Sequence, residues 1–224
     1  MKSPSRWSRW ILLPAIALAA LQPALASYTY PLSSEAIREA YFLGKRNDEQ
    51  TAAFFVKYVH SLPKPKSGPQ VGVIGIETPY SAIVRYVQHT PNDGYHAQEA
   101  EQDFLGKPAT FGVYVEIFFT ATYPDPSQMS PHGTNNVVTP AFWEDFKIRV
   151  KQDREIEALS TKGGPIYTEY GQGDQYGVMG AEVGGEVDLD YDPAKIDASS
   201  PLTVEVLTPD GQDVQTTFDL SQLR

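Results

Sequence analysis

The stretch FGVYVEIFFTATY, residues 111–123, alternates regularly between two kinds of side chain. One parity is apolar or aromatic throughout and consists of Phe111, Val113, Val115, Ile117, Phe119, Ala121 and Tyr123. Successive side chains of a strand point to opposite faces of its sheet, so this parity predicts a core face. The other parity contains Tyr114, Glu116 and Phe118 and predicts a second, half-covered face. We therefore predict a long central β-strand that the rest of the fold covers.

Period-two alternation marks further strands along the chain. They are expected near residues 70–77, 83–87, 146–151, 181–192, 202–206 and 214–220. The last two are joined by the turn Pro209-Asp210-Gly211, and the run Lys162-Gly163-Gly164-Pro165 predicts the turn of another hairpin.

Two helices are expected before the first strand. The first begins with a cap at Ser33 or Ser34 and ends near Gly44. The second begins at Asn47 or Asp48, and its Phe54, Phe55 and Tyr58 recur at helical spacing on through Leu62. We expect this aromatic stripe to cover the second face of the central strand.

Helices at one end, followed by seven or eight strands, are typical of a mainly β fold. We predict an antiparallel β-sandwich of immunoglobulin-like or C2-like architecture, with an N-terminal helical hairpin packed on it. The expected organisation is a cleaved signal peptide at 1–26, the hairpin at 27–66 and the sandwich domain at 67–224.

The first 26 residues have the composition of an export signal. Lys2, Arg6 and Arg9 precede an apolar run, and Ala24-Leu25-Ala26 is a small-residue cleavage box. Pro14, Gln22 and Pro23 interrupt the apolar run, which is too short for a spanning helix. We expect a protein exported to the periplasm or the external medium, with no membrane span after signal cleavage.

Composition narrows the range of partners. The formal net charge is −10, and the acidic excess grows once the three basic residues of the signal are removed. Such a chain repels nucleic acid, which we exclude as a partner. The chain has no cysteine, so packing rather than disulfides must stabilise it outside the cell.

Four aspartates form the best candidate metal site. Asp188, Asp190, Asp192 and Asp197 could supply the converging carboxylates that calcium prefers. The helix-loop-helix calcium motif is not satisfied here, which leaves a site at the tip of the sandwich. The alternative is that Asp188 and Asp190 form the solvated face of a strand, which also protects a sheet edge. Apart from calcium, no cofactor is expected.

Tyrosines among glycines form the candidate partner-binding segment. Tyr167, Tyr170 and Tyr176 could stack on sugar rings or anchor a protein partner. The alternative is that their rings fold back over the edge of the core.

Catalytic motifs are not found. No nucleophile elbow, phosphate-cradling loop or zinc-protease helix occurs in the sequence. We therefore favour an exported non-catalytic β-sandwich that binds a protein or an envelope polysaccharide. The alternatives are a secreted hydrolase with a dispersed active site, drawn from residues such as Glu116, His89 and His96, and a calcium-stabilised sandwich module.

Overall fold

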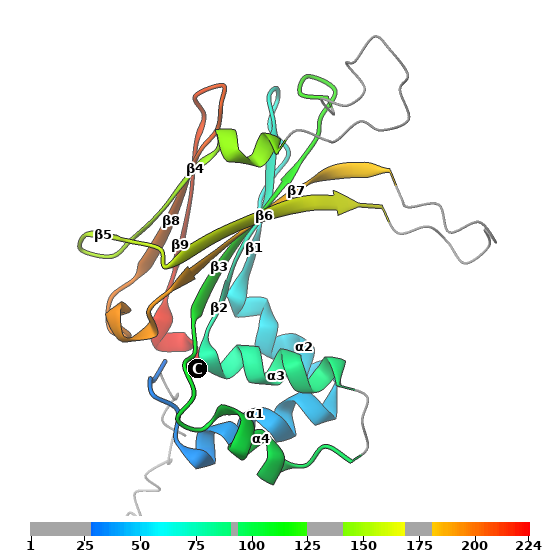
Figure 1. Ribbon diagram of the computed structural model, residues 1–224. Coiled ribbons are helices and arrows are strands. Elements are labelled where there is room, and N and C mark those ends of the chain that lie inside the picture. The colour runs from blue at the N-terminus through cyan, green and yellow to red at the C-terminus, as the bar shows by residue number, and fades with distance from the viewer. Residues whose placement is uncertain (1–27, 91–93, 125–140, 169–180) are drawn as a thin grey trace, which may run out of the picture.

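Two antiparallel β-sheets face each other across a shared apolar core. The computed structural model describes residues 28–90, 94–124, 141–168 and 181–224 (Figure 1). The five-stranded sheet has the order β1-β2-β3-β7-β6, and the four-stranded sheet has the order β5-β4-β8-β9. The nine strands within the described residues are β1 (Val59–Ser61), β2 (Gln70–Glu77), β3 (Phe111–Phe118), β4 (Lys147–Lys151), β5 (Glu155–Ile156), β6 (Ser160–Tyr167), β7 (Glu182–Tyr191), β8 (Leu202–Leu207) and β9 (Asp213–Phe218). The predicted mainly β, sandwich-like class is confirmed.

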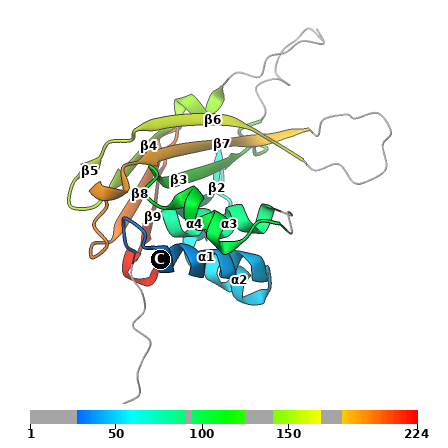
Figure 2. The same ribbon diagram turned by 60° about the horizontal axis from the view of Figure 1, so that its bottom comes forward.

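The helices gather beside one end of the five-stranded sheet (Figures 1 and 2). They are α1 (Ser34–Arg46), α2 (Glu49–Phe55), α3 (Pro79–His89) and α4 (Ala97–Phe104). The 3₁₀ turns of the described chain are η1 (Val56–Tyr58), η3 (Phe142–Asp145), η4 (Pro193–Lys195) and η5 (Leu220–Gln222), and η3 lies at the opposite end of the sheet (Figure 1). Ile37 and Ala40 of α1 share a small core with Ile83 and Val84 of α3. Within the described parts of the chain, no helix combines the length and the apolar character needed to cross a membrane.

The central strand β3 has the predicted parity. Phe111, Val113, Val115 and Ile117 are buried, and the residues between them are half-buried. The strand was predicted to extend to Tyr123 but ends at Phe118. Beyond the strand, the backbone N–H groups of Thr120 and Tyr123 each donate a hydrogen bond to the carbonyl oxygen of the other residue, which closes a tight turn.

The strand predicted at 83–87 is wrong, because these residues belong to α3. Thr78 and Ser81 form a reciprocal capping box, and Pro79 occupies the first turn, where its missing N–H costs nothing. The apolar residues of α3 also fit a helical stripe. Proline here starts a helix, whereas the sequence pattern suggested that it interrupts a strand.

The hairpin predicted around residues 162–165 is also wrong. β6 continues through Gly163, Gly164 and Pro165 and pairs with β7 along its length, with one irregularity near Ile166. A proline is tolerated because β6 is an edge strand, where one side of the backbone has no strand partner.

The second predicted helix ends early. Its aromatic spacing extends to Leu62, but α2 stops at Phe55 and the chain passes through η1 into the edge strand β1. Phe54 lies 4.8 Å from Tyr58 and 5.8 Å from Tyr80 between ring centroids. Phe54 therefore links the sandwich core, which contains Tyr58, to the helical core, which contains Tyr80.

Candidate functional site

One face of the five-stranded sheet points away from the sandwich core, and we call it the outer face. The strand register brings acidic and aromatic side chains together there. Tyr114 of β3 pairs with Asp188 of β7, and Glu116 pairs with Glu186. On the far side of β7, Asp188 pairs with Lys162 of β6. Side chains from three strands therefore share one surface, although they lie far apart in the sequence.

Two aromatic rings cover the backbone of β2. Tyr114 pairs with Gly75, and a Cβ placed on that glycine would lie 2.1 Å from Cζ of the tyrosine. A Cβ on Gly72 would lie 2.5 Å from the ring of Phe118 in the same way. Each ring thus occupies space that only a glycine leaves free, and each residue remains half-buried. Tyr114 and Phe118 are four residues apart on β3, so their Cα atoms are about 13 Å apart along the strand.

Carboxylates occupy the adjoining part of the outer face. The pKa of Glu186 is raised to about 7. The causes are burial, the negative charge of Asp188 and a hydrogen bond between the carboxyl groups of Glu186 and Asp188. Burial also raises the pKa of Glu116, the cross-strand partner of Glu186. Two like charges directly opposite each other destabilise a sheet, so Glu186 retains a proton close to neutral pH.

Arg85 connects this face to α3. Its Nε lies 2.9 Å from Oε1 of Glu77, and its guanidinium carbon lies 5.2 Å from the ring centroid of Phe55. Burial raises the pKa of Glu77, an effect that Arg85 opposes and that Asp188 strengthens. Burial raises the pKa of Tyr114 as well, whereas the nearby Arg85 lowers it. Arg85 is therefore a cation among carboxylates, held in place by an aromatic ring.

A shallow pocket of about 220 Å³ opens on the outer face. Its polar lining is Glu77, Tyr114, Lys162, Asp188 and Asp190. Hydroxyl-rich ligands need many hydrogen-bond acceptors and a few donors, and this set provides both. The pocket is a polar recess beside the ring of Tyr114.

The four predicted calcium ligands divide into two groups. Asp188 and Asp190 lie on the outer face, as the strand alternative proposed. Asp192 accepts a hydrogen bond from the backbone of Ala194, and Asp197 accepts from Ser199, so both carboxylates stabilise turns. Over the described residues, no group of three His, Asp or Glu side chains could hold a metal ion.

The two histidines considered as catalytic belong to helical segments, whereas Glu116 belongs to the strand β3. His89 is the last residue of α3, and His96 caps α4. His60 packs against Phe218, with 4.7 Å between ring centroids. Glu116 instead pairs with Glu186 of β7, which was not among the candidate residues from the sequence.

Of the three candidate tyrosines, Tyr167 ends β6 and is 42% exposed. Tyr170 and Tyr176 lie outside the described residues. Sequence reasoning missed Arg85 and Glu77 because the segment around Arg85 was taken for a strand. The two glycines of β2 were visible in the sequence, but Gly72 and Gly75 are three residues apart and Tyr114 and Phe118 are four apart, so only the register shift between Val71 and Val73 brings each ring over a glycine.

Comparison with protein families, with curated proteins and with solved structures found no match to this chain. The function must therefore be inferred from the geometry of the site itself.

Proposed function

We propose that this chain is an exported, non-catalytic β-sandwich protein that binds a neutral envelope polysaccharide on its outer face. The observation that carries the proposal is the pair of rings, Tyr114 and Phe118, lying over glycines beside a row of carboxylates. The basic, apolar and small-residue segments of the first 26 residues support export to the periplasm or the external medium. An immunoglobulin-like or C2-like arrangement, with the first two helices packed as a hairpin, remains our prediction for the finer architecture.

The rings supply a flat apolar surface. The face of an aromatic ring carries partial negative charge and attracts the weakly positive C–H bonds of a sugar ring. Because glycine leaves each ring lying over β2, neither ring needs to be ordered when a ligand binds, and the entropic cost of binding is small.

The charged groups determine which sugars fit. The carboxylates of Glu116, Asp188 and Asp190 accept hydrogen bonds from hydroxyl groups, while Arg85 and Lys162 donate. Acidic residues outnumber basic ones on this face, so a polyuronate or another anionic glycan would be repelled. We therefore infer a neutral glycan, in preference to a protein partner.

A glycan array of neutral and anionic oligosaccharides tests this proposal. Neutral hexasaccharides should bind, polygalacturonate fragments should not, and the combined Tyr114→Ala and Phe118→Ala changes should abolish binding. Tyr167→Ala is the matched control and should bind as the original chain does. If binding survives the loss of both rings but fails in the control, the tyrosine segment is the site instead.

One observation favours a second candidate, a glycoside hydrolase. Glu186 retains its proton close to neutral pH beside Glu116 and Asp188, and a protonated carboxyl beside an ionised one is the pair that glycoside hydrolysis requires. Release of reducing ends from a bound hexasaccharide separates the two functions. A hydrolase would produce them and lose this activity in Glu186→Gln, whereas a binding protein leaves the hexasaccharide intact.

A further inference from the structure

A second cavity lies on the open side of the sandwich, between β4 and β6, and shares only Lys162 and Leu189 with the pocket of the outer face. β4 pairs with β8 along its whole length but with β5 only at Val150 and Lys151. Within residues 147–149, the backbone groups that point away from β8 have no strand partner in the described part of the chain. These groups remain available for hydrogen bonding to another extended segment.

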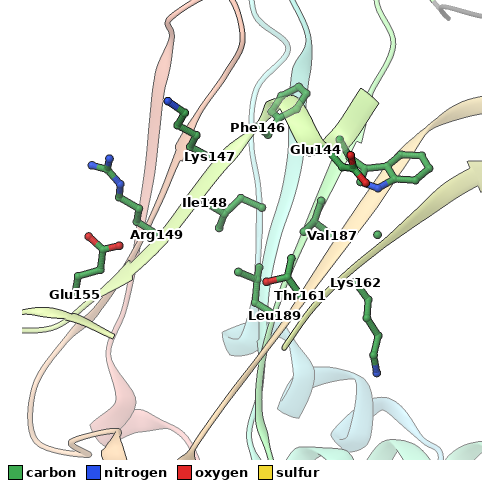
Figure 3. A pocket seen from close by; sticks show the side chains of 12 residues that line it. Glu144, Phe146, Lys147, Ile148, Arg149, Glu155, Thr161, Lys162, Val187 and Leu189 are labelled. Carbon is green, nitrogen blue, oxygen red and sulfur yellow. The ribbon is translucent and has the colours of Figure 1, made fainter. Parts of the chain in front are cut away.

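A cavity of about 510 Å³ lies beside this free edge. Figure 3 shows Ile148, Val187 and Leu189 pointing into the space between β4 and β6, together with Thr161. Trp143 borders the cavity and lies against β6, because a Cβ on Gly163 would be 2.2 Å from its Nε1. Five apolar side chains line the cavity together with charged ones, of which Lys147, Arg149 and Lys162 outnumber Glu144 and Glu155.

Charge lies on the other side of the same strand. Lys147 and Arg149 extend from β4 on the side opposite Ile148 in Figure 3, and both are exposed residues at the border of the cavity. Neither forms an ion pair with another described residue. A strand added beside β4 would place one parity in the cavity with Ile148 and the other parity beside these two cations.

We propose that this groove accepts a short extended peptide in which acidic and apolar residues alternate. The peptide would add to the free edge of β4, insert its apolar side chains into the cavity and pair its carboxylates with Lys147 and Arg149. The same cations repel basic strands, so they provide selectivity as well as attraction. The free edge spans about 10 Å, which limits recognition to roughly three residues.

This groove and the outer face use opposite parities of β7. Val187 and Leu189 point toward the groove, whereas Glu186, Asp188 and Asp190 belong to the outer face. Peptide binding therefore does not depend on the proposed glycan function, and either proposal can fail alone.

The test uses the fluorescence of Trp143. The chain contains three tryptophans, and Trp7 and Trp10 lie in the proposed signal peptide, so the chain beginning at residue 27 has Trp143 as its sole tryptophan reporter. The probe is the synthetic peptide Asp-Val-Asp-Val-Asp-Val-Asp with blocked ends, titrated at 0.15 M salt. We expect saturable binding with a shift of the emission to shorter wavelength, and no binding of the corresponding Lys-Val peptide.

Two controls separate strand addition from general charge attraction. The double change Lys147→Glu and Arg149→Glu should weaken binding at least tenfold, whereas Lys64→Glu with Lys66→Glu makes the same change of charge on an exposed loop and should leave affinity unaltered. Methylating the backbone nitrogens of alternate peptide residues should also abolish binding if they donate to the edge of β4. Thermal melting verifies that each variant folds. No binding, equal binding of the basic peptide, or equal losses in the two double variants would overturn the proposal.

Discussion

Glu186 retains a proton that an unfolded chain would release. Its pKa is about 7 in the fold and 4.5 ordinarily, because of burial and the charge of Asp188. Between these values the native state binds more protons than the unfolded state, so stability falls as the pH rises from about 4.5 through 7. The outer face therefore destabilises the protein most at alkaline pH.

Glu186→Gln should remove this pH dependence. The variant should melt at a higher temperature than the original chain at pH 8, roughly 2–4 °C higher for each kcal/mol recovered. At pH 3 the two should melt together, because the original carboxyl group is then protonated in both the folded and the unfolded state. Melting curves at both pH values check this, and an equal difference at pH 3 and pH 8 would contradict the assigned pKa.

Tyr58 fastens the last described residue to the core. It is 1% exposed, its hydroxyl donates to the carbonyl oxygen of Arg224 at 3.0 Å, and the same hydroxyl accepts from the Arg224 amide at 3.0 Å. Tyr58→Phe leaves both backbone groups without this partner, which costs about 1–3 kcal/mol. Urea unfolding measures the loss. Tyr86→Phe alters an exposed tyrosine and should cost much less.

The capping box of α3 is the element that sequence patterning misjudged. Thr78 is fully buried, and its hydroxyl accepts from the Ser81 amide at 3.1 Å and donates to the carbonyl oxygen of Arg224. Thr78→Ala should destabilise the chain by about 2 kcal/mol. Ser33 caps α1 in the same way but with an exposed hydrogen bond, so Ser33→Ala should cost no more than about 1 kcal/mol. Equal losses in urea unfolding would count against the role given to burial.

The two adjacent glycines of β6 offer a matched pair. A Cβ on Gly163 would collide with the indole of Trp143, whereas nothing lies within 4 Å of one on Gly164. Gly163→Ala should force Trp143 outward and shift its emission to longer wavelength, measured in the chain beginning at residue 27, where Trp143 is the sole tryptophan. Gly164→Ala should leave the spectrum unchanged. A spectral shift in both variants, or in neither, would contradict the packing of Trp143 on β6.

Sequence patterning predicted the elements whose two faces differ. The parity of β3 and the hairpin of β8 and β9 follow from alternating apolar residues, so both could be predicted locally. The segment at 79–89 could not, because Ile83, Val84 and Val87 suit a strand or a helix and the capping box decides between them. Pro165 was misjudged because its position on a sheet edge is set by strand order, which is a long-range property.

At the scale of the whole molecule, the candidate site depends on register between distant strands. Glu116 meets Glu186, and Tyr114 meets Gly75, only because β3 lies between β2 and β7. No local sequence pattern determines that strand order. The acidic and aromatic residues could be identified in the sequence, but their contact across neighbouring strands could not be predicted. Arg85 joins them through a helix that was not expected there.

The central claim is that a neutral glycan binds across the rings of the outer face. Isothermal titration with a neutral hexasaccharide that binds on the array tests it most directly. Tyr114→Ala should raise the dissociation constant at least fivefold, which corresponds to a loss of about 1 kcal/mol of binding free energy. Tyr167→Ala should leave the constant unchanged. An unchanged constant in Tyr114→Ala, together with a loss in Tyr167→Ala, would contradict the claim and move the site to the end of β6.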